Sequence, residues 1–126
     1  MTRRVTADRG QRGSGTLLMA GGMLLVMVVA AVALVLTAYI AAQHAAADAA
    51  DLSALSGAAA HLRGDDPCVA ARAVARANGA TLSSCTLSGD SFDFVVRVGV
   101  TRHMRSPPRL PDTVSATAEA GRLSGG

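Results

Sequence analysis

The segment that decides the fold is "LLMAGGMLLVMVVAAVALVLTAYIAAQHAAADAADL", residues 17–52. Its first part, from Leu17 to Ile40, has 24 positions (40 − 17 + 1) without a charged residue. A helix needs about 20 apolar residues to cross the hydrocarbon core of a bilayer. The apolar region of a cleaved secretory signal is shorter, about 7–15 residues. The segment therefore predicts a retained transmembrane helix, and a cleaved signal is the alternative.

Charge on the two sides of this run predicts its orientation. The residues before it include four arginines and one opposing acid, whereas the first charges after it are Asp48 and Asp51. The four are Arg3, Arg4, Arg9 and Arg12. Basic residues hold their flank in the cytoplasm. We therefore expect a single-pass protein of the cell membrane, with a cytoplasmic N-terminus and an extracytoplasmic C-terminal region.

The helix is expected to continue beyond the membrane. Alanine, the strongest helix former, dominates residues 38–60, and the first proline is Pro67. One helix over residues 16–62 is therefore predicted. Small residues recur at every fourth position, a spacing that lets another helix approach closely. They are Ala33, Thr37, Ala41, Ala45 and Ala49, followed by Ser53 and Gly57.

An apolar seam of Leu52, Leu55 and Leu62 would extend this packing surface outside the membrane. The alternative explanation for the alanines is the composition bias of a GC-rich genome.

The remaining chain predicts a second helix and a small sheet. Asp66 and Pro67 suit the start of a helix, and Asn78-Gly79 suits its end. On this helix Ala70, Ala71, Val74 and Ala77 are expected to face the sheet. Alternating patterns predict strands over 80–87, 92–104 and 113–121. The residues expected on the inner face of the middle strand are Phe92, Phe94, Val96, Val98 and Val100.

The predicted fold class is therefore α+β: a long N-terminal transmembrane helix, a short second helix and a three-stranded antiparallel sheet. Its segments are a cytoplasmic basic segment (1–15), the transmembrane helix with its extension (16–62), a small α+β head (63–121) and a flexible tail (122–126).

Two cysteines, Cys68 and Cys85, both lie outside the membrane in this topology. A pair in an oxidising compartment suggests a disulfide that would staple the small head. Two unpaired buried thiols are the alternative.

The sequence does not indicate an enzyme. His44, Asp48 and Asp51 have a spacing that would suit a metal on one helix face, but a solvated face just outside a membrane has the same spacing. No phosphate-binding loop and no nucleophile elbow is present, so we expect no catalytic residues, no cofactor, no metal and no small-molecule substrate. The arginines form no basic stripe with interleaved aromatic residues, so no nucleic-acid partner is expected.

Three stretches together resemble a known family. They are the "RGSGTLL" entry, the span with "AAQHAAADAADLSALSGAAA" after it, and the segment from Cys68 through Asn78-Gly79-Ala80 to Cys85. They resemble TadE/TadG-like proteins of Flp (tight-adherence) pilus systems, and the short actinobacterial TadE-like proteins in particular. The resemblance covers residues 9–121 and rests on composition more than on a fixed motif.

The resemblance implies a non-enzymatic, pseudopilin-like component of a Flp/Tad-type pilus or secretion assembly. Its partners would be the membrane and other pilus or secretion subunits, which it contacts through the N-terminal helix. Processed members carry a glycine followed five residues later by glutamate, which makes Gly13-Ser14 a candidate processing site. Leu18 stands at the glutamate position here, so the sequence departs from that pattern.

Two other functions remain open on sequence alone. One is a membrane-anchored extracytoplasmic binding or sensor module. The other is a small secreted protein whose N-terminus has been removed.

Overall fold

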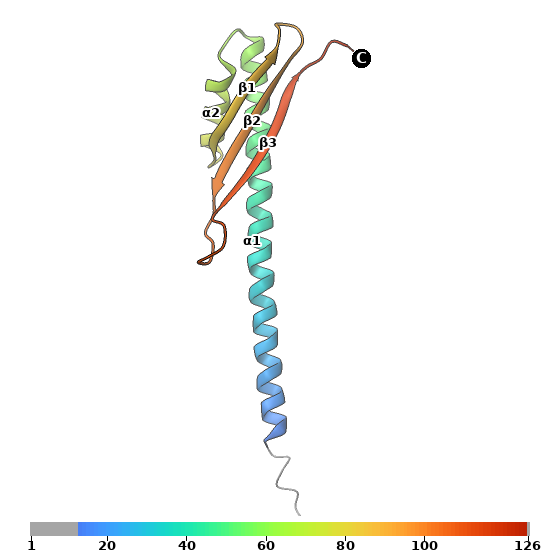
Figure 1. The fold of residues 1–126 in the computed structure, drawn as a ribbon, viewed down its shortest axis with the longest axis vertical. Helices are drawn as coiled ribbons and strands as arrows, with labels where there is room; N and C mark the ends of the chain where they lie inside the picture. Colours follow the sequence, from blue (N-terminus) through green and yellow to red (C-terminus); the bar gives the residue numbers. More distant parts are fainter. Residues whose placement is uncertain (1–12, 126) are drawn as a thin grey trace, which may run out of the picture. The chain divides into compact units, whose positions relative to one another are not determined.

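A computed structural model describes residues 13–125. The helices are α1 (Ser14–Leu62) and α2 (Pro67–Ala77), and the strands are β1 (Thr81–Gly89), β2 (Phe94–His103) and β3 (Thr113–Arg122) (Figure 1). The predicted α+β class is confirmed, with a long helix, a short helix and three antiparallel strands. Most of the predicted basic segment, residues 1–12, and the last residue of the predicted tail lie outside the described residues.

The chain divides into two compact units, and the division falls inside α1. One unit ends at Leu36 and the other begins at Thr37. The second unit therefore joins the outer part of α1 to the segment 63–121 that the sequence marked as a head. We call residues 37–62 outer α1. From here on the head means residues 37–125, and so it includes outer α1.

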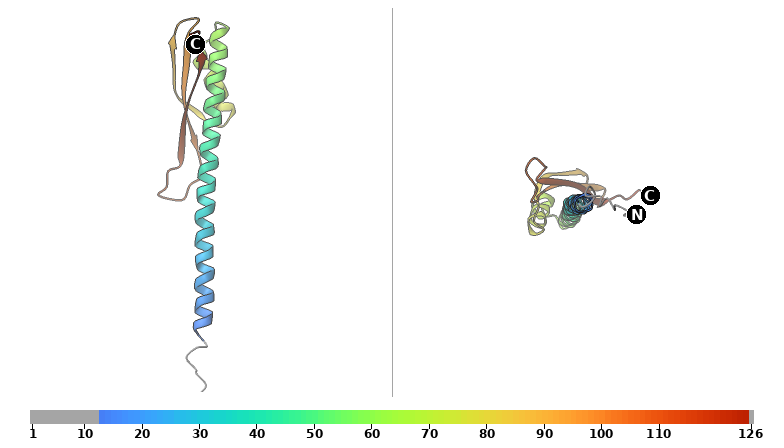
Figure 2. Two further views of the ribbon diagram at one scale, coloured as in Figure 1. Left: turned by 90° about the vertical axis from the view of Figure 1, so that its right-hand side faces the viewer. Right: turned by 90° about the horizontal axis from the view of Figure 1, so that it is seen from below.

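The sheet of the head is an antiparallel meander in the order β1-β2-β3. Outer α1 and α2 lie on one face of it, and no helix of residues 13–125 lies on the opposite face (Figure 2). Alternation along β2 sends its apolar side chains to the helical face. Four of them, Phe94, Val96, Val98 and Val100, are the largest apolar side chains in the core and are fully buried. The middle strand therefore supplies nearly all the bulk of the core.

Outer α1 contributes small residues to the same core. Its buried positions are Ala46, Ala49, Ala50, Ser53, Ala54, Gly57 and Ala60. The Ser53 hydroxyl donates to the carbonyl of Ala49 at 2.6 Å, so this buried polar group is satisfied. Because these side chains are short, the helix backbone lies close to the valines of β2. The small side chains of the helix thus pack against the large side chains of the strand.

Gly57 is a position of close approach between outer α1 and the rest of the head. A Cβ atom built there would lie 3.0 Å from the Pro67 carbonyl oxygen and 3.1 Å from Val96 Cγ1. The backbone of α2 and a side chain of β2 therefore meet outer α1 at this one position. A lone glycine inside an alanine-rich helix would be unfavourable without such a contact.

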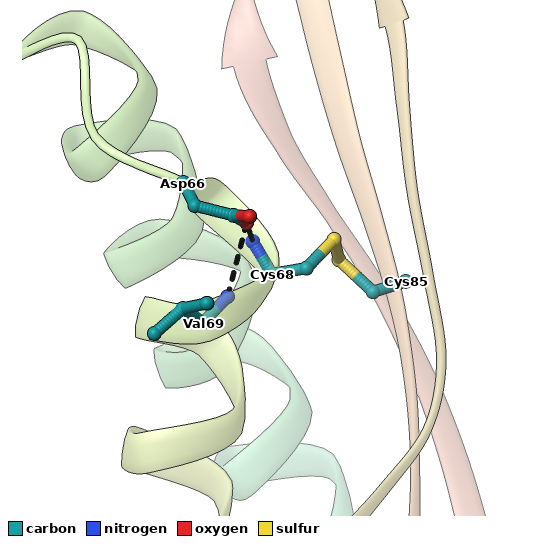
Figure 3. Close-up of a disulfide and its surroundings, with 4 residues drawn as sticks. All are labelled: Asp66, Cys68, Val69 and Cys85. Atoms are coloured by element: carbon teal, nitrogen blue, oxygen red, sulfur yellow. Dashed lines mark hydrogen bonds between the residues drawn. A yellow bond between two sulfur atoms is a disulfide. The ribbon is translucent and has the colours of Figure 1, made fainter.

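The ends of α2 are set by its sequence, as expected. Asp66 Oδ1 accepts hydrogen bonds from the backbone N–H groups of Cys68 (2.8 Å) and Val69 (3.2 Å), and Pro67 occupies the first helical position (Figure 3). At the other end Asn78 is the C-cap, and Gly79 follows with a φ of 70° that suits glycine.

The inner face of α2 differs from the expected one. Ala71 and Ala75 are buried, whereas Ala70 and Val74 are half-buried and Ala77 is exposed. The reason is that α2 contacts outer α1 as well as the sheet: the Cβ of Ala71 lies 3.7 Å from the Cβ position built on Gly57. The prediction considered only the contact of α2 with the sheet and not its contact with outer α1. The buried face of α2 is therefore rotated about the helix axis relative to the predicted one.

Phe92 also lies in a different place from the expected one. It is 75% exposed and belongs to the turn between β1 and β2, because β2 begins two residues later than predicted. Asp90 Oδ1 accepts from the N–H groups of Phe92 and Asp93, each at 2.8 Å, and so holds residues 90–93 in a turn. These hydrogen bonds, from Asp93 first and Phe92 second, lower the pKa of Asp90 below its usual 3.8.

The contact at Gly57 gives a direct test of this packing. Replacing Gly57 with leucine inserts a side chain where a Cβ alone already meets Pro67 O at 3.0 Å. Overpacking of this kind typically destabilises a core by about 1–3 kcal/mol. We expect a loss of at least that size in the free energy of unfolding of the full chain in detergent. The matched control is Ala59→Leu, on the exposed side of the same helix, which should leave stability nearly unchanged.

Candidate functional site

The first feature of interest is the inner part of α1. All residues from Gly13 to Ala41 are exposed, and most of those from Leu17 onwards are apolar. Within the described residues, α1 is the one helix that is long and apolar enough to cross a membrane. An exposed apolar surface of this extent needs lipid or another protein to cover it. The buried residues of α1 all follow this run, and the first of them is Ala46.

The candidate processing pair lies at the start of α1. Ser14 is the first helical residue, and the Gly13 carbonyl accepts a hydrogen bond from the Leu17 N–H at 3.2 Å. Gly13 therefore acts as the residue that caps the helix, and the bond between Gly13 and Ser14 lies at the helix terminus. Leu18 is exposed in the first turns of the helix.

The predicted ridge of small residues divides between two environments. Ala33, Thr37 and Ala41 are exposed, and Ala45 is half-buried. Ala49 is 1% exposed, because it belongs to the core that outer α1 forms with its own sheet. Ser53 and Gly57 continue into the same core. The outer half of the ridge is therefore occupied by the chain's own α2 and β2.

The opposite side of outer α1 carries an apolar stripe that α2 and the sheet do not cover. We call Leu52, Leu55, Ala59 and Leu62 the leucine seam. Their spacing of three, four and three residues keeps them on one helix face. Leu55 is 61% and Leu62 is 59% exposed. The seam is thus a second, outward-facing surface on a helix whose inner side is fully used.

The polar residues that precede the seam are all exposed. His44, Asp48 and Asp51 lie on outer α1 with solvent around them. Among residues 13–125, no three or more His, Cys, Asp or Glu side chains gather closely enough to hold a metal ion.

The two cysteines form a disulfide, as expected. Cys68 in the first turn of α2 is bonded to Cys85 of β1, with 5.8 Å between their Cα atoms (Figure 3). The bond ties the outermost helix of the head to an edge strand of the sheet. A second tie lies at the other end of α2, where Arg102 Nη1 donates to the Asn78 carbonyl at 2.7 Å.

Beside the disulfide is a shallow, open hollow. It has a volume of about 200 Å³ and lies between α2 and β1. Its lining consists of the two cysteines with Arg72, Leu82, Ser83 and Ser84. Ligand pockets are typically deeper, with volumes of about 300–1,000 Å³ and converging polar groups. The hollow therefore offers little enclosure to a small molecule.

The outer face of the sheet is polar. A bulge between Leu82 and Ser84 of β1 brings both Ser83 and Ser84 over Gly99, where a Cβ would lie 2.5 Å from Ser84 Oγ. Arg97 and Glu119 form an exposed ion pair across β2 and β3. Serines, threonines and one ion pair thus cover this face, and it presents no apolar patch.

The chain matches no protein-family model, no curated protein and no solved structure.

The staple between α2 and β1 leads to a prediction about stability. Cys68 and Cys85 are 17 positions apart. Closing a loop of about this size contributes about 3 kcal/mol by restricting the unfolded chain. The double variant Cys68→Ala, Cys85→Ala should lose about that much of the free energy of unfolding, measured by denaturant titration of the detergent-solubilised protein.

Reductant provides the control. It should destabilise the native chain by the same amount and leave the double variant unchanged. A native chain whose unfolding midpoint does not respond to reductant would contradict the staple.

Proposed function

We propose that this protein is a single-pass membrane subunit of a Flp/Tad-type pilus or secretion assembly, and that it acts by packing against other subunits and not by catalysis. The observation that carries the proposal is the leucine seam. It lies outside the apolar run, on the one face of outer α1 that the head leaves uncovered. A helix that is anchored in a membrane and carries an exposed apolar stripe is suited to helix–helix contact.

The proposed orientation rests on two independent arguments. Four arginines precede the apolar run, which favours a cytoplasmic N-terminus. The disulfide lies on the other side of that run, and disulfides persist in oxidising compartments outside the cytoplasm. Both arguments support a head that lies on the extracytoplasmic side of the membrane.

The seam supports an assembly role for a physical reason. Leu55 and Leu62 are more than half exposed and Leu52 is 47% exposed, so these side chains contribute little to the core of the head. Burying one such side chain against a partner is worth about 1.5–3 kcal/mol. Three leucines at heptad-like spacing therefore provide enough free energy to hold a partner helix, especially one already confined to the same membrane.

The link to Flp/Tad systems rests on the resemblance described above. The absence of glutamate at Leu18 favours a subunit that stays anchored as an assembly component over one that is processed and enters a filament. An ionisable residue inside a bilayer is costly unless it is paired, so leucine suits a retained anchor. If processing after Gly13 occurs, the mature chain would begin with the first residue of α1.

Photo-crosslinking in native membranes tests the proposal. A photoreactive phenylalanine analogue at Leu55 should form an adduct with a second membrane subunit, because that side chain faces outward within the seam. The same analogue at Leu87, which is 42% exposed on β1, is the control and should give no specific adduct.

Identification of the adduct by mass spectrometry separates the alternatives. Another subunit of a pilus or secretion machine supports the proposal. An adduct at Leu87 alone would favour a binding module that uses the sheet. Recovery of a soluble protein that lacks the apolar run would show a secreted product and contradict the anchor.

Changing the seam should weaken the association without harming the fold. The triple variant Leu52→Gln, Leu55→Gln, Leu62→Gln should lose co-purification with the partner found at Leu55, while its unfolding midpoint stays within a few degrees of the native value, since exposed substitutions change stability by only about 0.5 kcal/mol each. Leu87→Gln should leave co-purification intact. Retention of the partner by the triple variant would count against the seam as the interface.

A further inference from the structure

We propose that the loop between β2 and β3, residues 104–112, contacts the phospholipid headgroups of the membrane in which α1 is anchored. This inference rests on the proposed anchor. It adds a second point of attachment, which would fix how the head stands on the membrane surface. We call residues 104–112 the β2–β3 loop.

Two contacts establish the direction in which outer α1 and the sheet run. Near the start of outer α1, Gln43 Nε2 donates to the Ser115 carbonyl at 3.0 Å. Near its end, the rings of His61 and Phe94 lie 4.4 Å apart, and Phe94 pairs with Arg122 at the end of β3. Outer α1 and β3 therefore run in the same direction, and the β2–β3 loop leaves the end of the sheet nearest Gln43 (Figures 1 and 2).

The height of the loop follows from these contacts. Thr113 precedes Ser115 by two strand residues, which is about 7 Å along the strand. The same distance along a helix is about four to five residues, so Thr113 lies level with Tyr39 on the helix. The β2–β3 loop continues beyond Thr113 in the same direction. The loop therefore lies at the level of the last turn of the apolar run, which ends at Ile40.

The membrane boundary must lie at that same level. The 24 positions from Leu17 to Ile40 make a helix of about 36 Å, whereas the hydrocarbon core is about 30 Å thick and each headgroup layer adds about 5–7 Å. Residues 37–40 thus lie in or next to a headgroup layer. If residues 37–40 lie at a headgroup layer, a loop level with them is within reach of the headgroups.

The chemistry of the loop suits headgroups. Arg105 and Arg109 are exposed, and neither has a carboxylate partner within the described part of the chain; the one acid of the loop, Asp112, stands at its base. Guanidinium groups bind phosphate oxygens through two parallel hydrogen bonds. Leu110 is 51% exposed beside them, and an apolar side chain at this depth can enter the acyl boundary.

The backbone presents these side chains in a fixed turn. The Leu110 N–H donates to the Pro107 carbonyl at 3.2 Å, and the Met104 N–H donates to the Asp112 carbonyl at 2.7 Å, which closes the loop. Arg109 has a φ of 74°, a conformation in which glycine or asparagine is normally found at this turn position. The strained backbone at Arg109 is consistent with a binding role for its side chain, because strained residues are found at functional sites.

Tryptophan fluorescence tests the proposal, because the native chain contains no tryptophan. The full chain is reconstituted into vesicles of phosphatidylcholine and phosphatidylglycerol whose acyl chains are brominated near the headgroup. Leu110→Trp reports on the β2–β3 loop. Phe92→Trp is the control, since Phe92 is exposed in the turn at the opposite end of the sheet. Flotation of the vesicles shows separately whether the protein is membrane-bound.

We expect Leu110→Trp to emit at a shorter wavelength than Phe92→Trp and to be quenched several-fold more strongly by the brominated lipid. Adding Arg105→Gln and Arg109→Gln to Leu110→Trp should reduce that quenching. The matched pair Arg72→Gln and Arg76→Gln removes the same charge from the exposed side of α2 and should not reduce it.

The contrary outcomes are distinguishable. Equal, weak quenching at both positions in protein that floats would overturn the loop contact and leave the anchor intact. Protein that fails to float would overturn the anchor and the loop contact together. Equal effects of the two arginine pairs would overturn the specific contact between the loop arginines and lipid phosphate.

Discussion

The packing of the small-residue face of outer α1 on the valines of β2 is the interaction on which the rest of the structure depends. The large side chains of the core come from β2, and outer α1 contributes alanine, serine and glycine. Those of β2 are Phe94, Val96, Val98 and Val100. This contact brings α2 within reach of Gly57 and directs the leucine seam outward. Without outer α1, α2 and the sheet would have only a small hydrophobic core. Small cores are marginally stable unless a disulfide or another element supports them.

Local chemistry allowed much of the fold to be predicted from the sequence. Asp66 and Pro67 start α2, Asn78 and Gly79 end it, and alternation marks β2 and β3, because each of these signals acts within a few residues. What depends on tertiary contact was not predictable. The ridge that ends at Ala49, Ser53 and Gly57 has the same four-residue spacing whether it meets another subunit or its own sheet. Phe92 fits the alternation of β2, but the Asp90 side chain holds it in the turn.

The candidate surfaces were predictable to different degrees. The disulfide and the leucine seam follow from residue types and spacing. The membrane contact that we propose for the β2–β3 loop does not, since it depends on the register between Gln43 and Ser115, residues far apart in the sequence. In the proposed role one helix has three surfaces: the apolar run for lipid, one side of outer α1 for the core of the head, and the seam on the other side for a partner. Each use restricts a different face, which explains why small residues and leucines occupy distinct stripes.

The most direct test of this account compares two shortened chains. Residues 37–126 retain outer α1, whereas residues 63–126 retain only α2 and the sheet. If outer α1 completes the core, the longer fragment gives a dispersed amide NMR spectrum and a cooperative thermal transition, and the shorter one gives the narrow spectrum of an unfolded chain even with its disulfide formed. A dispersed spectrum and cooperative unfolding for residues 63–126 alone would contradict the account, because α2 and the sheet would then fold without outer α1.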